Sequence, residues 1–226
     1  MNFGKLTPVI VSTVKEQVYR KVQEAIISGS LPPGREVTIS QLARDLGVSL
    51  MPVREAIRAL EVEKLISVQK SRRIKINELS TRDLHEILMI RINLECMAVE
   101  RGIERCTDET VSDLERILEG MKTAKDSYEF LTKNKQFHHT LYLNADMPIL
   151  REIIDYLWQR VSPYLSIYVS KIPESKTYAI HYHEGMIQGA KERDGEKVCK
   201  WLRLDLKKGA EFVTTFLRSQ GSAESD

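Results

Sequence analysis

The stretch TISQLARDLGVSLMPVREAIRALEVEKLI, residues 38–66, contains two short amphipathic segments separated by a glycine. Thr38 and Gln41 have the spacing of a capping box, which predicts the start of a first helix. Gly47 is expected to end that helix, and Ser49 is placed to cap a second one. Two short helices joined by a glycine-containing turn are typical of a helix-turn-helix motif. The residues expected to fill the inner faces of the two helices are Leu42, Ala43, Leu46, Val48, Val53, Ile57 and Leu60.

The segments on either side extend this motif. Residues 14–29 carry valine, alanine and isoleucine at helical spacing, and Gly29 is expected to end this helix before the turn LPPG. After the motif, ISVQK (66–70) and RRIKI (72–76) alternate apolar and polar residues, which predicts a small β-hairpin. The sequence therefore predicts an N-terminal winged helix-turn-helix domain over residues 1–76.

Positive charge is concentrated in this first part of the chain. Residues 1–76 hold 13 Lys and Arg against 7 Asp and Glu, whereas the whole chain has a net charge of +2. A basic segment on a weakly acidic body favours contact with a polyanion. Cations on the second motif helix and on the hairpin suit phosphate neutralisation, and arginine can also bind guanine edges. The alternative is that they are solvated surface charges. The candidate DNA-binding residues are Ser49, Arg54, Arg58, Lys70, Arg72 and Arg73.

The rest of the chain shows helical periodicity and no convincing strand. The segment NELST, residues 77–81, is interpreted as a linker, and residues 82–219 are predicted to form an all-α helical bundle. The last residues, 220–226, are expected to be a frayed tail. The fold class is therefore mainly α. Five breaks, which separate six helices, are expected near residues 106–107, 125–126, 146–148, 172–173 and 194–195.

Composition narrows the class of protein. The chain has 226 residues, of which 42% are hydrophobic and 29% charged, as in ordinary soluble globular proteins. Its apolar runs are far shorter than the ~20 residues that a membrane-spanning helix needs. Cys96, Cys106 and Cys199 are widely spaced, which argues against a disulfide framework or a cysteine-ligated zinc. We expect a cytoplasmic protein with no membrane partner.

Several helices of the predicted bundle place polar residues in their apolar stripe. In YEFLTKNKQFHHTLYLNA, residues 128–145, Asn134 and His138 lie one turn apart on the inward face. The same argument points Arg91, His183 and Asp205 inward from three other helices. Because an unpaired buried charge costs several kcal/mol, five such residues on four helices suggest a built site.

These five side chains favour two kinds of site. Two imidazoles and a carboxylate are good ligands for a divalent transition metal such as zinc, and Arg91 could then hold the carboxylate of an effector. The same residues could equally form a hydrogen-bonded polar core, or a metal-free pocket that binds a small organic acid. His139 is expected outside the site, because successive helical residues are rotated by about 100°.

The run from Gln17 to Ile76 resembles the DNA-binding domain of the GntR family of bacterial transcription regulators. The matching stretches are SGSLPPG, QLARDLGVS, PVREAI and LEVEKLI. The helical remainder resembles the C-terminal domain, called FCD, of the FadR-like branch. The resemblance implies a homodimeric, ligand-responsive regulator that binds near-palindromic double-stranded DNA, and we expect it to be a repressor. It also implies that residues 82–219 bind the effector and dimerise.

The chain departs from the family pattern at informative positions. Leu50 stands where the family usually has arginine after the capping serine, and the hairpin lacks the usual glycine. Many relatives bind a divalent metal through an aspartate, a histidine one turn later and two further histidines. His138 and His183 match this pattern, whereas Asn134 replaces the aspartate and Asp205 replaces the last histidine. The resemblance implies a metal held by His138, His183 and Asp205, with Asn134 as a weak ligand or a supporting residue.

Two alternatives to this function remain from the sequence. A metal-dependent hydrolase could use such a metal to activate water, but Glu184 is expected to point away from His183, so an obvious general base is missing. The basic N-terminal segment would also be unexplained in an enzyme. A regulator that senses the metal itself is the other alternative. The sequence therefore favours a regulator over an enzyme.

Overall fold

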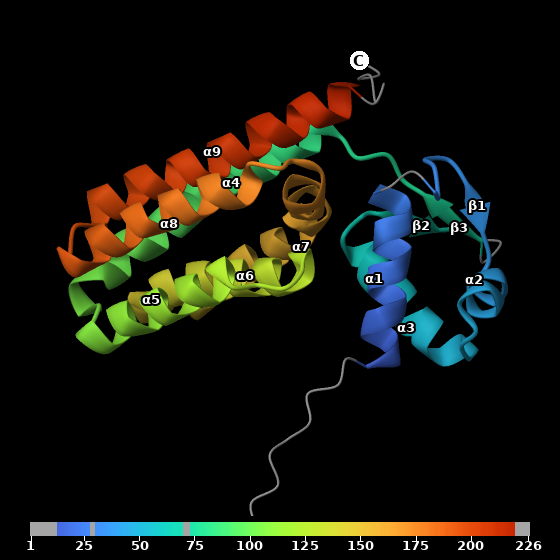
Figure 1. Cartoon of the computed structure of the whole chain (residues 1–226), viewed down its shortest axis with the longest axis horizontal. Helices are drawn as coiled ribbons and strands as arrows, with labels where there is room; N and C mark the ends of the chain where they lie inside the picture. Colours follow the sequence, from blue (N-terminus) through green and yellow to red (C-terminus); the bar gives the residue numbers. More distant parts are fainter. Residues whose placement is uncertain (1–12, 28–29, 70–72, 220–226) are drawn as a thin grey trace, which may run out of the picture. The chain divides into compact units, whose positions relative to one another are not determined.

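The computed structural model describes residues 13–27, 30–69 and 73–219, and the chain divides into two compact units between Asn77 and Glu78 (Figure 1). The described residues are mainly helical with one small sheet, which confirms the predicted fold class. In the first unit, α3 packs against both α1 and α2. Its elements are α1 (Val14–Ile27), β1 (Glu36–Val37), α2 (Ile39–Leu46), α3 (Leu50–Val62), β2 (Ile66–Val68) and β3 (Ile74–Ile76).

The helix-turn-helix motif is built by the residues that predicted it. The Thr38 side chain accepts a hydrogen bond from the Gln41 amide at 3.1 Å, and the Gln41 side chain accepts one from the Thr38 amide at 2.8 Å. Gly47 ends α2 with φ +66, a backbone conformation that costs a glycine little. The prediction for Ser49 is wrong in one respect: it occupies the position before α3, but its side chain makes no capping hydrogen bond.

The wing contains one strand more than the sequence predicted. The hairpin of β2 and β3 is confirmed, with Ile66 opposite Ile76. In addition, Glu36 and Val37 form β1, which pairs antiparallel with β3 in the sheet order β1-β3-β2. A strand of two residues has no periodicity to detect. Gly29, expected to end the first helix, lies outside the described residues.

Among the described residues, the second unit contains the six predicted long helices. Hydroxyl or carboxylate caps start three of them: Ser80, Thr107 and Asp126 each accept a hydrogen bond from the backbone amide three residues later. A proline at the first position starts α7. The elements are α4 (Thr81–Gly102), η1 (Ile103–Arg105), α5 (Asp108–Lys122), α6 (Ser127–Leu141), η2 (Leu143–Ala145), α7 (Pro148–Lys171), α8 (Ser175–Lys191) and α9 (Gly195–Ser219).

The packing of this bundle brings together helices that are distant in sequence. The first helix of the unit, α4, packs against the last, α9, and also contacts α7 (Figure 1). In addition, α8 packs against α9, and α5 packs against α6. Apolar side chains from all six helices are buried between them. This arrangement lets α4, α6, α8 and α9 aim side chains at one interior. No helix in the described ranges is long and apolar enough to cross a membrane.

A partly buried carboxylate links two helices of the first unit. Glu63, directly after α3, accepts a 2.6 Å hydrogen bond from the hydroxyl of Tyr19 on α1, and that hydroxyl accepts one from Gln23 at 2.8 Å. Burial raises the pKa of Glu63 to about 7, and the hydrogen bonds from Tyr19 and Gln23 offset only part of this effect. The folded protein therefore binds this proton more tightly than the unfolded chain does.

The first unit should lose stability as the pH rises through about 7, the pKa of Glu63 in the folded state. The stabilisation from protonated Glu63 is complete below its ordinary pKa of 4.5 and is lost above the folded pKa. Between pH 5 and pH 8 we expect a loss of about 1–3 kcal/mol, since one pKa unit corresponds to about 1.4 kcal/mol. Native-state hydrogen exchange of the α1 and α3 amides, corrected for intrinsic rates, measures it.

The matched variants isolate the contribution of this carboxylate. Glu63→Gln keeps an acceptor for Tyr19 but cannot ionise, so the pH dependence of opening should flatten. Glu24→Gln changes an exposed glutamate of α1 and should leave the pH dependence as in the wild type. An unchanged pH dependence in Glu63→Gln contradicts the assignment.

Candidate functional site

The outer face of α3 carries two of the arginines predicted to bind DNA. Val53 and Ile57 are buried on the side of the helix that packs into the unit, so Arg54 and Arg58 are exposed one turn apart on the other side. Ser49 is exposed at the beginning of the same helix. All three predicted residues are thus exposed to solvent, and the two arginines share one face of α3, as a recognition helix requires.

Of the three wing residues predicted to bind DNA, only Arg73 lies within the described residues. Arg73 forms an ion pair with Glu36 of β1 at 3.0 Å, with side chains that are 60% and 38% exposed. An ion pair this exposed contributes little to stability, so Arg73 can exchange Glu36 for a phosphate at low cost. Lys70 and Arg72, the other wing residues in the DNA-binding prediction, lie outside the described residues.

The interior of the helical unit is built around a buried ion pair. Arg91 and Glu95 lie one turn apart on α4 with 2.7 Å between Nε and Oε1, and both side chains are at most 1% exposed. The guanidinium group also lies 4.0 Å from the centre of the Trp158 ring. Burial alone would raise the pKa of Glu95, but the charge of Arg91 and the contact with His138 outweigh it and lower the pKa. Glu95 is therefore ionised and neutralises Arg91.

His138 lies between this ion pair and a second carboxylate. Its Nδ1 is 3.1 Å from Oε2 of Glu95, and its Nε2 is 3.4 Å from Oδ2 of Asp205 on α9. Burial would lower the pKa of His138, but the hydrogen bonds to Asp205 and Glu95 outweigh burial, so the pKa is raised. The sequence analysis did not include Glu95 among the site residues. Its position in the same apolar stripe of α4 as Arg91 was the signal that could have identified it.

His183 is held in one tautomer by its own helix. Its Nδ1 lies 2.6 Å from the backbone oxygen of Ala179, and because a carbonyl only accepts, Nδ1 carries the hydrogen. The other nitrogen, Nε2, is therefore an unprotonated base. It is buried and has no hydrogen-bond partner among the described residues. Burial, with a smaller contribution from the charge of His138, lowers the pKa of His183 to about 4.

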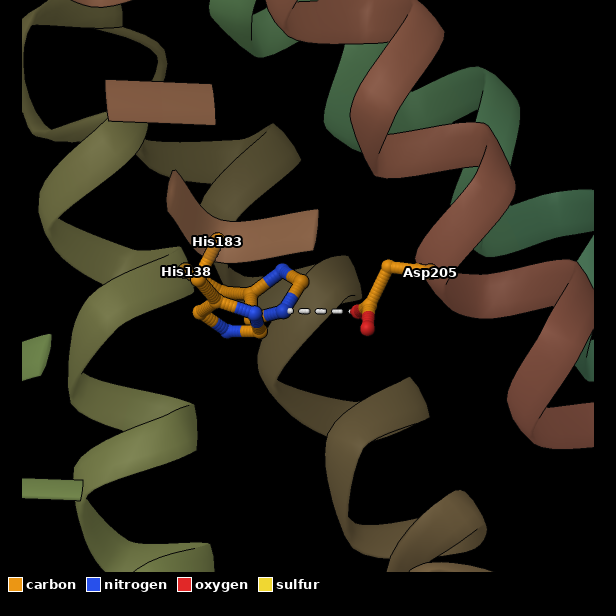
Figure 2. A group of neighbouring side chains, drawn as sticks. All are labelled: His138, His183 and Asp205. Carbon is orange, nitrogen blue, oxygen red and sulfur yellow. Dashed lines mark ion pairs between the residues drawn. The ribbon is translucent and has the colours of Figure 1, made fainter. Parts of the chain in front are cut away.

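His138, His183 and Asp205 converge in the centre of the bundle, with Asp205 facing the two rings (Figure 2). One ligand atom from each residue can be chosen so that all three lie within 4.8 Å of one another. Tetrahedral zinc places its ligand atoms about 3.3 Å apart, so a small inward movement would complete such a set. Glu95 and the Ala179 carbonyl orient the two imidazoles from behind, as supporting groups do in metal sites. The residues present therefore fit a divalent metal.

A cavity of about 40 Å³ adjoins His138 and Asp205. Its polar wall is formed by Arg91, Asn134, His138 and Asp205, and its remaining walls are mostly apolar. A buried water needs roughly 10–15 Å³ measured in this way, so there is room for about three waters. Asn134 is buried one turn before His138, as predicted from the helical spacing. Glu95 already neutralises Arg91 through Nε, so an effector could bind only to the rest of the guanidinium group. Its buried Nη2 has no hydrogen-bond partner among the described residues.

The remaining histidines of the described chain lie apart from this cluster. His139 pairs with Asp155 of α7 at 3.2 Å, and its side chain is 26% exposed. His85 and His181 are exposed. Glu184, the acid next to His183 in the chain, forms an ion pair with Lys122 at 2.9 Å, so it points away from the site as expected. Glu184 is therefore not available as a general base beside His183.

Comparisons with known proteins agree with both units. The family model for "Bacterial regulatory proteins, gntR family" matches residues 14–76, and the model for the FCD domain matches residues 86–207. The HTH-type transcriptional regulator McbR of Escherichia coli (strain K12) is 32% identical over 189 residues, which is 81% of this chain and 86% of that protein. The gluconate operon transcriptional repressor of Bacillus subtilis (strain 168) is 28% identical, over 79% of this chain and 76% of that protein.

A solved structure is similar over nearly the whole length. The structure of E. coli McbR/YncC superposes with a TM-score of 0.68 and 28% sequence identity, and the similarity covers 91% of this chain and 99% of that one. The similarity therefore includes the N-terminal motif as well as the helical unit.

Removing the carboxylate of Glu95 should strongly destabilise the helical unit. Glu95→Ala leaves the buried guanidinium of Arg91 unpaired, and breaking such a pair costs about 3–5 kcal/mol. Glu100→Ala changes an exposed glutamate on the same helix and should cost less than about 0.5 kcal/mol. Denaturation followed by tryptophan fluorescence reports on this unit, because Trp158 and Trp201 both belong to it.

A double variant separates the lost ion pair from lost packing. Arg91→Met with Glu95→Met replaces both charges by apolar side chains and should recover much of the stability lost in Glu95→Ala. Equal stability of Glu95→Ala and Glu100→Ala would contradict the structural role given to this pair.

Proposed function

The chain belongs to the GntR family of bacterial regulatory proteins, with an FCD domain as its helical unit, and on this premise we propose that it is a dimeric repressor controlled by a small carboxylate at a divalent metal. The matched family and the similar proteins identify the chain as a transcription regulator and not as an enzyme. The dimer, the metal, the effector class and the direction of regulation are our proposals. Each is supported by a different observation.

The unpartnered Nε2 of His183 is the observation that carries the metal proposal. A buried base without a partner costs free energy, and a bound cation would remove this cost. The ligands would be His138, His183 and Asp205, with Asn134 beside His138 as a weak ligand or a support. A divalent ion such as zinc, when bound, supplies positive charge and open positions for an effector. Glu95 holds His138 with its Nδ1 hydrogen directed at the carboxylate, which leaves Nε2 for the ion.

The charge of the site favours an anionic effector only with the metal present. Arg91 and Glu95 cancel each other. With both histidines neutral, as ligands must be, a dication outweighs the single charge of Asp205 and leaves one net positive charge. A carboxylate would neutralise this charge, and Nη2 of Arg91 remains as an additional donor.

The small cavity favours a second candidate signal. A volume of about 40 Å³ holds an ion with a few waters, but not an organic acid of many atoms without movement of the helices. In this second candidate the metal itself is the signal. Measuring DNA affinity with metal alone and with metal plus small carboxylates distinguishes the two.

Exposed apolar side chains on α4 and α7 support a dimer. Met89 and Met97 of α4 are 65% and 48% exposed, and Ile149, Ile153 and Tyr156 of α7 are 74%, 45% and 49% exposed. The two helices pack against each other. Groups of exposed large apolar residues mark interaction surfaces, and a second copy would cover them. Dimerisation would present two recognition helices to successive major grooves, about 34 Å apart.

The direction of regulation is inferred from a relative. The B. subtilis protein with 28% identity is named a transcriptional repressor of the gluconate operon. We infer repression for this chain as well. Binding of the effector would then shift the population between states with different DNA affinity.

Protein purified without a tag from metal-replete cells should contain about one divalent ion per chain. Asp205→Ala and His183→Ala should each lose most of it, because ligand substitutions remove a strong donor from a small set. Asp155→Ala, which removes a carboxylate that pairs with His139 outside the cluster, should retain the metal. Elemental analysis measures the content, and circular dichroism checks folding. If the wild-type protein contains no metal, the metal proposal is wrong.

DNA binding should depend on Arg54 and Arg58. A duplex enriched from a random pool at low salt, titrated in sedimentation velocity, gives both affinity and stoichiometry. We expect two chains per duplex and a loss of about ten-fold or more in affinity for Arg54→Ala and for Arg58→Ala, since each arginine contact contributes about 1–3 kcal/mol. Arg116→Ala, an exposed arginine of α5, should bind as the wild type does.

These outcomes separate the two parts of the proposal. If no duplex is enriched at low salt, the DNA-binding proposal is wrong. If DNA is bound by a single chain and the free protein sediments as a monomer, the dimer is wrong although DNA binding remains.

A further inference from the structure

Two large apolar side chains are exposed on the outer face of α3. Leu50 is 44% exposed and Met51 is 64% exposed. They lie four and three residues before Arg54, so in a helix each is its direct neighbour on the surface. Arg58 extends the same face by one more turn. The DNA-binding face of α3 therefore contains a pair of apolar side chains at one end and two arginines beyond them.

The fold of the first unit does not explain this apolar pair. The inner face of α3 is filled by Val53, Ala56, Ile57 and Leu60, each at most 3% exposed. A single exposed apolar residue is ordinary in proteins, but two adjacent ones on a surface that meets a polar, charged partner need a local reason. That reason must lie in what the face contacts.

We propose that Leu50 and Met51 bind the C5-methyl groups of thymines in the major groove of the operator. The inference rests on the proposed DNA binding and adds a specificity to it. The thymine methyl is the one apolar group among the base edges of the major groove. A leucine side chain has no hydrogen-bonding atom, and a methionine sulfur is only a weak acceptor. Against guanine or cytosine edges they would leave polar groups without partners.

The spacing along the helix limits where these thymines lie. A helix rises about 1.5 Å per residue, so Leu50 and Arg54 are about 6 Å apart along its axis. Base pairs in DNA are about 3.4 Å apart. The thymines are therefore one or two base pairs from the base or phosphate that Arg54 contacts, and the same arrangement repeats in the second half-site.

Deoxyuridine substitution tests this contact at the level of one methyl group. In the enriched duplex, each thymine is replaced in turn by deoxyuridine, which removes the methyl but keeps base pairing and charge. At one or two thymines per half-site the wild-type protein should lose about four-fold in affinity, the value expected for one buried methyl group. Fluorescence anisotropy at constant salt measures the affinities.

Protein variants then identify which side chains contact the methyl. Leu50→Ser with Met51→Ser should bind the thymine and the deoxyuridine duplex equally, because the apolar partner is gone. Val62→Ser, at the other end of α3 and also exposed, should keep the four-fold difference. Arg54→Ala should weaken binding to both duplexes alike. All four substitutions, in three variants, change exposed side chains, and thermal unfolding verifies that the variants fold.

The outcomes either support the inference or overturn it. It is overturned if no deoxyuridine changes the affinity of the wild type, or if the difference persists in the double serine variant, because the methyl then acts through DNA shape or another residue. Absence of any enriched duplex would instead refute DNA binding itself. Loss of the difference in the double variant, and its retention in Val62→Ser, supports the inference.

Discussion

The ion pair of Arg91 and Glu95 is the constraint on which the helical unit depends. Both side chains are almost completely buried, and removal of either would leave the other without its partner in the interior. Glu95 uses its second oxygen to hold His138, and His138 reaches Asp205, so one chain of contacts ties α4 to α6 and α9. The Arg91–Glu95 pair forms within α4, but the two contacts of His138 require α4, α6 and α9 to meet in this register. The same contacts that satisfy the buried charges therefore position the candidate metal ligands.

Much of this fold could be predicted from the sequence, because its signals are local. Apolar residues at helical spacing, and the breaks between them, predicted the six long helices. The strand β1 was missed because two residues carry no pattern. Periodicity also placed five polar residues correctly in the interior, since it depends only on the angle between successive residues. It could not supply the contact of Glu95 with His138, which joins residues 43 apart in the chain.

The tautomer of His183 also could not be predicted from the sequence, for a different reason. It depends on the position of one backbone oxygen, that of Ala179, relative to the ring. Spacing in the sequence indicates that the two residues are a turn apart, but not which ring nitrogen turns toward the carbonyl. On α3, by contrast, stability constrains only the inner face. Its outer residues can change with little effect on folding, and this freedom explains how Leu50 can differ from the family pattern.

The size of the interior cavity would limit how quickly the proposed effector could reach it. The cavity has room for about three waters, and side chains of α4, α6, α7, α8 and α9 form its walls, so these helices would have to move apart before a larger molecule could bind in it. Association would then be limited by the opening of the bundle, not by diffusion. At high effector concentration the rate would reach a plateau equal to the opening rate. Such a regulator would respond with a delay set by its own packing, and would ignore brief pulses of effector.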